Sequence, residues 1–194
     1  MAEPACRRCG WVRGALMEAY HDQEWGRPLH DDARLYEMLF LEGFQAGLSW
    51  YIVLSKREAF RRAFSDFDPQ AVAAYGEADV ARLMQAEGIV RNRLKILGAI
   101  TNAQVFLAIQ QEFGSFDRYL WGFVPDGPVI CREDVFPTSS PLSDAVSADL
   151  KKRGMKFVGT VTIYSFLESI GIIDDHEQHC FVRTELDAAR AAQA

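Results

Sequence analysis

The sequence predicts an all-α fold, organised as one domain of two helical lobes. Apolar residues recur at helical spacing along most of the chain. Residues that favour helix ends border these stretches. The hints of β-strand are short, such as Val129–Ile130, so no large sheet is expected to organise the core. We therefore interpret residues 1–194 as a single helical domain.

Four helices are expected between residues 31 and 88. Acidic and hydroxyl side chains can accept hydrogen bonds from the free N–H groups of a first turn, and Pro suits the first helical position. Gly favours the left-handed conformation that often ends a helix. The residues that mark these ends are Asp31 and Asp32, Ser49, Asp68–Pro69 and Gly88.

The second half of the chain contains the longest expected helix, over residues 90–114. A loop rich in Pro, Asp, Gly and Ser follows over residues 124–143 and can separate the two lobes. Two further helical segments, 144–154 and 156–171, close the ordered part. The Ala-rich end, residues 186–194, is expected to fray because terminal residues without apolar anchors are poorly ordered.

Composition narrows the class of protein. The chain has 49% hydrophobic and 25% charged residues, which is typical of a globular domain. No apolar run approaches the roughly 20 residues that a membrane helix needs. The first residues lack the apolar core of a signal peptide, so we expect a cytoplasmic protein. We also expect a monomer. The net charge of −6 argues against a broadly cationic coat for nucleic acid but permits a local basic patch.

Four metal-type ligands form two pairs at opposite ends of the chain. Cys9 and His21 lie near the N-terminus, and His176 and Cys180 lie near the C-terminus at i, i+4 spacing. Two Cys and two His suit tetrahedral Zn²⁺, and four protein ligands leave no open position for a catalytic water. The interpretation is a structural zinc site that ties the two ends of the chain together.

Three alternatives to this ligand set stay open. Cys6 is three residues before Cys9, a spacing that zinc sites also use, and it could replace one ligand. His179 lies beside Cys180 and could compete with His176. All of these residues could also be unrelated surface side chains.

A carboxylate in an apolar segment marks a second candidate site. Glu42 lies in MLFLEGFQAGLSW, where Gly43 and Gly47 would allow another group to approach closely. Burying a carboxylate is costly unless it has a partner or a function. Glu42 could accept hydrogen bonds from a planar ligand stacked on Trp50 or Tyr20. The alternative is that Glu42 pairs with an Arg or caps a neighbouring helix.

Basic residues follow a predicted helical hairpin. The turn at Gly88 is followed by Arg91, Arg93 and Lys95. Free N–H groups at a helix start bind phosphate well, and nearby cations add to that attraction. The hairpin is therefore a candidate for contact with the DNA backbone, without reading sequence. The alternative is an ordinary helical hairpin with a solvated basic face.

Six short segments spread from Cys9 to Cys180 connect these sites. In order they are CGWV, AYHDQEWG, LFLEGFQAGLSW, GIVRNRLKI, LKKRGMKFVGT and the terminal HxxxC. Together they resemble the DNA-3-methyladenine glycosylase I family, which belongs to the helix-hairpin-helix glycosylase superfamily. The resemblance covers almost the whole chain.

This resemblance implies a fold, an activity and site residues. The implied fold is the all-α helix-hairpin-helix glycosylase fold, and the implied activity is excision of 3-methyladenine from alkylated double-stranded DNA. The family's structural zinc ligands match the two end pairs already named. Its base pocket matches Glu42, Tyr20 and Trp50. Two positions depart from related patterns: Met17 stands where some members have a pocket Tyr, and the hairpin turn lacks the second Gly common in the superfamily.

The implied chemistry needs little acid catalysis. Methylation at N3 gives adenine a positive charge, so the base leaves as a neutral molecule. The enzyme must mainly flip the nucleotide out of the helix and select the damaged base. Aromatic faces attract a cationic ring, and an ionised Glu42 could accept a hydrogen bond from its exocyclic amine. Asn92 lies near the position of a lyase lysine, so a monofunctional enzyme is expected.

Two rival functions follow from the same residues. A non-enzymatic, zinc-stapled DNA-binding module would explain the metal ligands and the hairpin but not Glu42 beside Trp50. A zinc hydrolase would need an open ligand position, which the four-ligand set does not leave. Release of 3-methyladenine from methylated DNA distinguishes the glycosylase from the binding module.

Overall fold

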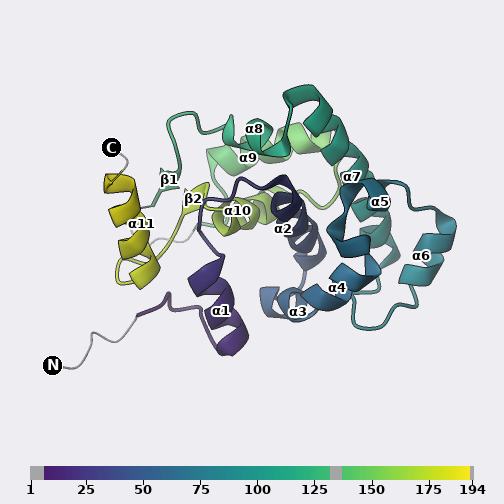
Figure 1. The fold of residues 1–194 in the computed structure, drawn as a ribbon, viewed down its shortest axis with the longest axis horizontal. Helices are drawn as coiled ribbons and strands as arrows, with labels where there is room; N and C mark the ends of the chain where they lie inside the picture. The colour runs from purple at the N-terminus through teal and green to yellow at the C-terminus, as the bar shows by residue number, and fades with distance from the viewer. Residues whose placement is uncertain (1–6, 132–136, 193–194) are drawn as a thin grey trace.

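A computed structural model describes residues 7–131 and 137–192, and these residues are mainly helical (Figure 1). Two short strands and one 3₁₀ turn, η1, interrupt the helices. The elements are α1 (Ala15–Gln23), α2 (Asp32–Gln45), α3 (Trp50–Ser55), α4 (Arg57–Ala63), η1 (Ser65–Phe67), α5 (Pro69–Ala73), α6 (Glu77–Leu83), α7 (Arg93–Phe113), α8 (Phe116–Trp121), β1 (Val129–Ile130), α9 (Pro141–Lys152), α10 (Thr160–Ser169), β2 (Ile173–Asp174) and α11 (Phe181–Ala191).

Helix α2 is the centre of the core. Figure 1 shows α2 and α10 near the middle of the molecule, with α11 at one end and α5 and α6 at the other. Helix α2 contacts α3, α7, α8 and α10. Its side chains are buried on nearly every face from Leu35 to Leu41, as expected for a helix enclosed by others. The side chain of Asp31 accepts a hydrogen bond from the Arg34 N–H and begins the helix, as the sequence predicts.

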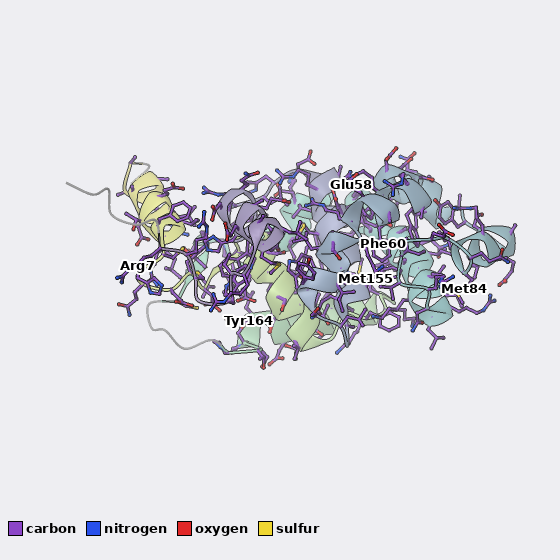
Figure 2. The ribbon with its side chains drawn as sticks, turned by 90° about the horizontal axis from the view of Figure 1, so that it is seen from below. Arg7, Glu58, Phe60, Met84, Met155 and Tyr164 are labelled. Atoms are coloured by element: carbon purple, nitrogen blue, oxygen red, sulfur yellow. The ribbon has the colours of Figure 1, made fainter. Side chains whose placement is uncertain are left out.

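The two ends of the described chain lie against each other. The N–H of Phe181 donates to the carbonyl of Arg7 at 2.9 Å, and Figure 2 places Arg7 beside α11. The N–H of Gly10 donates to Glu177 Oε1 at 2.6 Å. These contacts hold the N-terminal segment beside the segment that precedes α11.

The predicted helical content is confirmed, and so is the short strand at Val129–Ile130. This strand pairs in parallel with β2, which sequence patterns did not indicate, with Val129 opposite Ile173. Among the described residues, no helix combines the length and hydropathy that a membrane crossing requires.

Three boundaries differ from the sequence-based expectations. The segment after Ser49 forms two helices, α3 and α4, because the backbone departs from helical angles at Lys56. Helix α6 ends at Leu83 rather than near Gly88, because the chain must turn before α7 and buries Ile89 in doing so. The Ala-rich end does not fray from residue 186, since α11 buries Leu186 and continues to Ala191.

Candidate functional site

A cavity of about 230 Å³ lies between α1, α2, α3 and α10. This volume suits a small planar molecule better than an extended ligand. Aromatic side chains form most of its wall, and two carboxyl groups face into it. The lining residues are Trp11, Met17, Tyr20, Trp25, Glu42, Gln45, Trp50, Ser165 and Glu168.

Glu42 is the polar group of this cavity that most needs a ligand. It lies in the last turn of α2, is 3% exposed, and its Oε2 has no hydrogen-bond partner among the described residues. Burial raises the pKa of Glu42 to about 8, because a carboxylate loses hydration there. Within the described part of the chain no Arg forms an ion pair with Glu42, and Arg57 binds Glu24 and Glu37 instead.

Tyr20 and Trp50 form an aromatic corner beside Glu42. Their ring centroids are 5.3 Å apart and the rings are tilted by 49°. The Trp50 indole N–H is buried and has no acceptor among the described residues. Burial, together with the negative charge of Glu42, raises the pKa of Tyr20, so its hydroxyl stays protonated. The corner therefore offers flat faces and hydrogen-bond donors next to an acceptor.

The cavity contains residues that sequence reasoning did not assign to it. Trp11 and Trp25 come from segments near the metal ligands, and Gln45 and Ser165 lie on α2 and α10. Glu168 is the most informative omission. Its surroundings in YSFLES are as apolar as those of Glu42, so the same criterion would have selected it. Met17 is buried and lines the cavity, where the family resemblance places it.

Glu168 is the second carboxyl group in the cavity. Burial and the neighbouring Asp175 raise its pKa to about 9, and the charge of Glu42 adds to the effect. Two carboxyl groups in one small cavity disfavour each other's ionisation. A cationic ligand would relieve that repulsion, whereas a neutral ligand would not.

Three of the four predicted metal ligands meet in the structure. The ligand atoms of Cys9, His21 and Cys180 all lie within 4.8 Å of one another, and all three residues are buried. Cys180 Sγ is 3.4 Å from His21 Nε2. The hydrogen bond that Cys9 donates lowers the pKa of Cys180 to about 4 and raises the pKa of Cys9, so Cys180 is the thiolate of this pair, the form that binds metals.

The fourth predicted ligand, His176, packs beside this group but not within 4.8 Å of all three ligand atoms. Its ring lies edge-on to His21 with centroids 5.4 Å apart, and its buried Nε2 has no partner among the described residues. Asp174 holds its Nδ1 at 2.8 Å, as Asp22 holds the Nδ1 of His21. Carboxylates on Nδ1 commonly orient metal-binding histidines and leave Nε2 for the ion.

Neither of the two alternative ligands, His179 and Cys6, is observed in the cluster of described residues. His179 is exposed and contacts the carbonyl of Arg8 and the carboxylate of Glu177 instead of the cluster. Cys6 lies outside the described residues. The donor set of two thiols and two imidazoles therefore fits Zn²⁺, with the unpartnered His176 Nε2 as the observation that supports a fourth ligand.

Gly26 makes room for His176. Its φ of +72° is unfavourable for other residues, and a Cβ there would lie 2.2 Å from the His176 ring. We expect Gly26→Ala to displace this imidazole and to lower the zinc content measured by elemental analysis of purified protein. Gly76→Ala is a control, because a Cβ at Gly76 meets nothing within 4 Å. Wild-type zinc content in folded Gly26→Ala protein would show that His176 is not a ligand.

Residues 84–92 join α6 to α7, a longer connection than the short turn that the sequence predicts. Gly88 has a φ of +82°, and a Cβ there would lie 2.8 Å from the Cβ of Ala59, so only Gly fits this close approach. Arg91 is exposed and available for phosphate. Arg93 is also exposed but pairs with Glu77 at 2.9 Å, an ion pair that solvent weakens.

Lys95 does not lie where the sequence interpretation places it. Its side chain is buried, and its Nζ donates to the carbonyls of Phe44 at 2.6 Å and Ala46 at 2.7 Å. The prediction that Lys95 contacts the DNA backbone is wrong for this structure, because its ammonium group points into the protein. The helical position of Lys95 in α7 turns it toward the end of α2.

Comparison with known proteins gives a consistent result. A family model described as methyladenine glycosylase matches residues 11–183. The chain is 49% identical over 177 residues to DNA-3-methyladenine glycosylase 1 of Escherichia coli (strain K12), covering 89% of this chain and 95% of that protein. It is 41% identical over 183 residues to DNA-3-methyladenine glycosylase of Haemophilus influenzae, covering 91% of this chain and 98% of that protein.

Solved structures show the same similarity. A crystal structure of 3-methyladenine DNA glycosylase I is 49% identical, with a TM-score of 0.87 over 90% of this chain and 98% of that one. The 3-methyladenine DNA glycosylase I of Staphylococcus aureus, solved for its recognition of 3-methyladenine, is 38% identical. Its TM-score is 0.87 over 92% of this chain and 97% of that chain.

Proposed function

The chain belongs to the methyladenine glycosylase family, and we propose that it hydrolyses the N-glycosidic bond of 3-methyladenine in double-stranded DNA. In this proposal the damaged nucleotide is flipped out of the helix and its base enters the cavity beside Glu42. The observation that carries the proposal is the buried Glu42 Oε2, which has no hydrogen-bond partner among the described residues and shares the cavity with the rings of Tyr20 and Trp50. We further propose that residues 1–194 act as one monomeric glycosylase domain of two helical lobes.

The cavity suits a cationic base for electrostatic reasons. 3-Methyladenine in DNA carries a positive charge, which weakens the bond to the sugar and lets the base leave as a neutral molecule. Glu42 can accept a hydrogen bond from the exocyclic amine, while Tyr20 and Trp50 offer ring faces. The pKa of Glu42 lies near 8 in the free protein, and a cation beside it favours the ionised form. An unmodified, neutral adenine gains no such attraction.

The same residues support a hydrolase without a lyase step. None of the described residues lining the cavity is a lysine. Asn92, near the position of a lyase lysine, caps α7 by accepting a hydrogen bond from the Lys95 N–H. The ammonium group of Lys95 is itself bound to two carbonyls. We therefore propose that water, not an amine, attacks the sugar carbon.

We propose that Cys9, His21, His176 and Cys180 hold a structural Zn²⁺. When bound, the ion would join the two ends of the chain, and four protein ligands would leave it no catalytic position. The ligand rings also support the cavity wall. Trp11 packs edge-on against His21 with centroids 5.5 Å apart, and Trp25 packs against His176 at 4.5 Å. Both tryptophans line the cavity, so the metal site would shape the base pocket without touching the base.

A release assay tests the proposed activity. Wild-type protein incubated with methylated double-stranded DNA should liberate 3-methyladenine, detected by chromatography with mass spectrometry. The DNA strand should stay intact until alkali cleaves the abasic site, because no lyase step is proposed. Absence of released base would overturn the glycosylase proposal, and strand cleavage before alkali treatment would overturn its monofunctional character.

We propose that the hairpin contacts DNA phosphates through Gly88, Arg91 and Arg93. Arg91→Ala should weaken DNA binding equally for different sequences, because phosphate contacts carry no sequence information. The slope of log affinity against log salt should fall by about 1. Fluorescence anisotropy over a salt series measures both quantities.

Arg34→Ala is the matched control for this experiment. Arg34 is an exposed Arg in the first turn of α2, at the opposite end of that helix from Glu42. Its removal should leave the salt slope unchanged. A loss of affinity in Arg91→Ala that depends on DNA sequence would contradict the phosphate contact.

A further inference from the structure

We propose that Lys95 is a positioning residue that joins the DNA-binding hairpin to the base pocket. Its backbone belongs to the first turn of α7, and its side chain holds the turn between α2 and α3. The inference rests on the proposed function, since it concerns how that reaction's pocket is kept in shape. Sequence reasoning assigned Lys95 to DNA phosphate, which the structure contradicts.

The contacts of Lys95 are those of a helix cap supplied from another helix. The last carbonyls of a helix have no partner within it, and a cation near them is favourable. Lys95 Nζ donates to Phe44 O at 2.6 Å and to Ala46 O at 2.7 Å, which are the carbonyls at the end of α2. Lys95 is 7% exposed, and its bond to Phe44 O is buried while its bond to Ala46 O is partly buried, so water is largely kept from the pair. Shielding strengthens them and raises the cost of leaving either carbonyl unpaired.

The turn held by Lys95 carries two residues of the pocket wall. Gln45 comes before the turn and Trp50 comes after it, and both line the cavity. Within the turn, the N–H of Leu48 donates to Gln45 O at 2.6 Å and Gln45 Nε2 donates back to Leu48 O at 2.9 Å. Gly47 reverses the chain with a φ of +79°. The two hydrogen bonds of Lys95 join this small turn to a different helix, α7.

The other side of the connection lies in the hairpin. The Lys95 N–H donates to Asn92 Oδ1 at 3.2 Å, and Asn92 directly follows the exposed Arg91. One residue therefore has its backbone fixed beside the phosphate-binding turn and its side chain fixed beside Gln45. The hairpin is thus linked through the buried Lys95 side chain to the turn that carries Gln45 and Trp50.

Lys95→Met tests this role, because Met keeps a long apolar stem but cannot donate to the carbonyls. We expect the single-turnover rate of 3-methyladenine release at saturating enzyme to fall about 10-fold or more, since small misplacements at a reactive site are costly. The salt slope of DNA binding should stay at the wild-type value, because the ammonium group does not face DNA. Arg91→Ala, by contrast, should lower both the affinity for DNA and the salt slope of binding.

A second variant distinguishes positioning of the pocket by Lys95 from a general contribution of Lys95 to stability. Ile109→Ala removes a fully buried side chain near the far end of α7 and should destabilise the protein without slowing the single-turnover reaction of folded enzyme. Thermal melting establishes that every variant is folded at the assay temperature. Should Lys95→Met not fold, Lys95→Gln, whose side chain is too short to reach both carbonyls, serves the same test.

Two results would overturn the proposal. A wild-type rate in a folded Lys95 variant would show that the contact does not position the pocket. A salt slope reduced by about 1 with an unchanged rate would return Lys95 to the phosphate-binding group. Failure of the underlying activity is recognised separately, because wild-type protein would then release no 3-methyladenine.

Discussion

Replacing Glu42 by Gln will slow the release of 3-methyladenine by about 100-fold and leave the protein folded. Gln keeps the shape of the side chain and removes the negative charge that a cationic base would meet. Removal of one preorganised electrostatic group from a shielded site typically costs about 10²–10³ in rate. The buried position of Glu42 places it in this class, because little water is present to replace its charge. Single-turnover kinetics on methylated DNA measures the effect.

A matched surface variant distinguishes the loss of a carboxylate in the cavity from the loss of one negative charge anywhere on the protein. Glu58→Gln makes the same chemical change on α4, where the side chain is 71% exposed and its described ion pair is with Arg61. Its rate should equal that of wild-type protein. Equal rates for Glu42→Gln and wild-type protein would remove Glu42 from the reaction.

The same substitution should have the opposite effect on stability. The pKa of Glu42 is about 8 in the folded protein, above its ordinary value of 4.5, so the folded protein holds this proton more tightly than the unfolded chain does. The contribution of Glu42 to the unfolding free energy therefore falls as pH rises from about 4.5 to about 8. Gln has no proton to lose. Glu42→Gln should become progressively more stable than wild-type protein across this range.

Urea unfolding at pH 5 and at pH 8.5 measures the change. Tyr20 stays protonated over this range, and Glu168 loses only the contribution that the charge of Glu42 makes to its raised pKa, so the difference between the two proteins reports Glu42 together with its coupling to Glu168. A stability difference that does not grow with pH would mean that Glu42 is better solvated than its position indicates. Together, lower activity and higher stability at alkaline pH would mark Glu42 as a residue kept for function.

Residue chemistry predicted much of the site because two of its features are local. A carboxylate in an apolar run pointed to Glu42, and two Cys–His pairs pointed to the metal cluster. Trp11, Trp25 and Ser165 could not be assigned in this way, because the cavity forms only where four elements meet. Glu168 could have been found, since it satisfies the same criterion as Glu42.

Composition alone misplaces two segments, because it ignores which way a helix face points and what packs on it. Composition predicts that Lys95 faces DNA, because it is basic and follows Arg91 and Arg93. Its spacing of four residues from Ala99, which is buried, puts both on one face of α7 and favours burial. The Ala-rich end was expected to fray, but Leu186 supplies an apolar anchor and Arg190 forms an ion pair with Asp174 at 2.6 Å. The burial of Lys95 and the anchoring of α11 can be predicted only by asking which residues share a helix face, not from composition alone.

Removal of the proposed zinc will lower the stability of the protein and, as a consequence, its activity. Binding of structural zinc contributes roughly 10–16 kcal/mol in isolated zinc-finger peptides, where it supplies most of the folding free energy. This chain has a large core besides the cluster, so we expect a folded but less stable protein. Cys180→Ser should lower the melting temperature and reduce bound zinc from one ion per chain to much less, measured by elemental analysis.

Controls for this prediction come from ligand-type residues outside the proposed set. Cys131→Ser and His179→Ala should keep one zinc per chain, because Cys131 lies outside the cluster and His179 is exposed. Cys6→Ser should also keep it, which tests whether Cys9 alone supplies the N-terminal thiolate. Full zinc occupancy in folded Cys180→Ser protein would contradict the ligand set.

Loss of the metal should also alter the base pocket, because two tryptophans pack against both the ligand histidines and the cavity. His21 and His176 pack against Trp11 and Trp25, so loosening the histidines should enlarge or reshape the cavity that these rings line. Binding of free 3-methyladenine, followed by calorimetry at a temperature where Cys180→Ser is folded, should therefore weaken. Unchanged binding in zinc-depleted, folded protein would show that the metal ties the chain ends together without shaping the pocket. Weakened binding with intact Glu42 would show that the two sites form one mechanical unit.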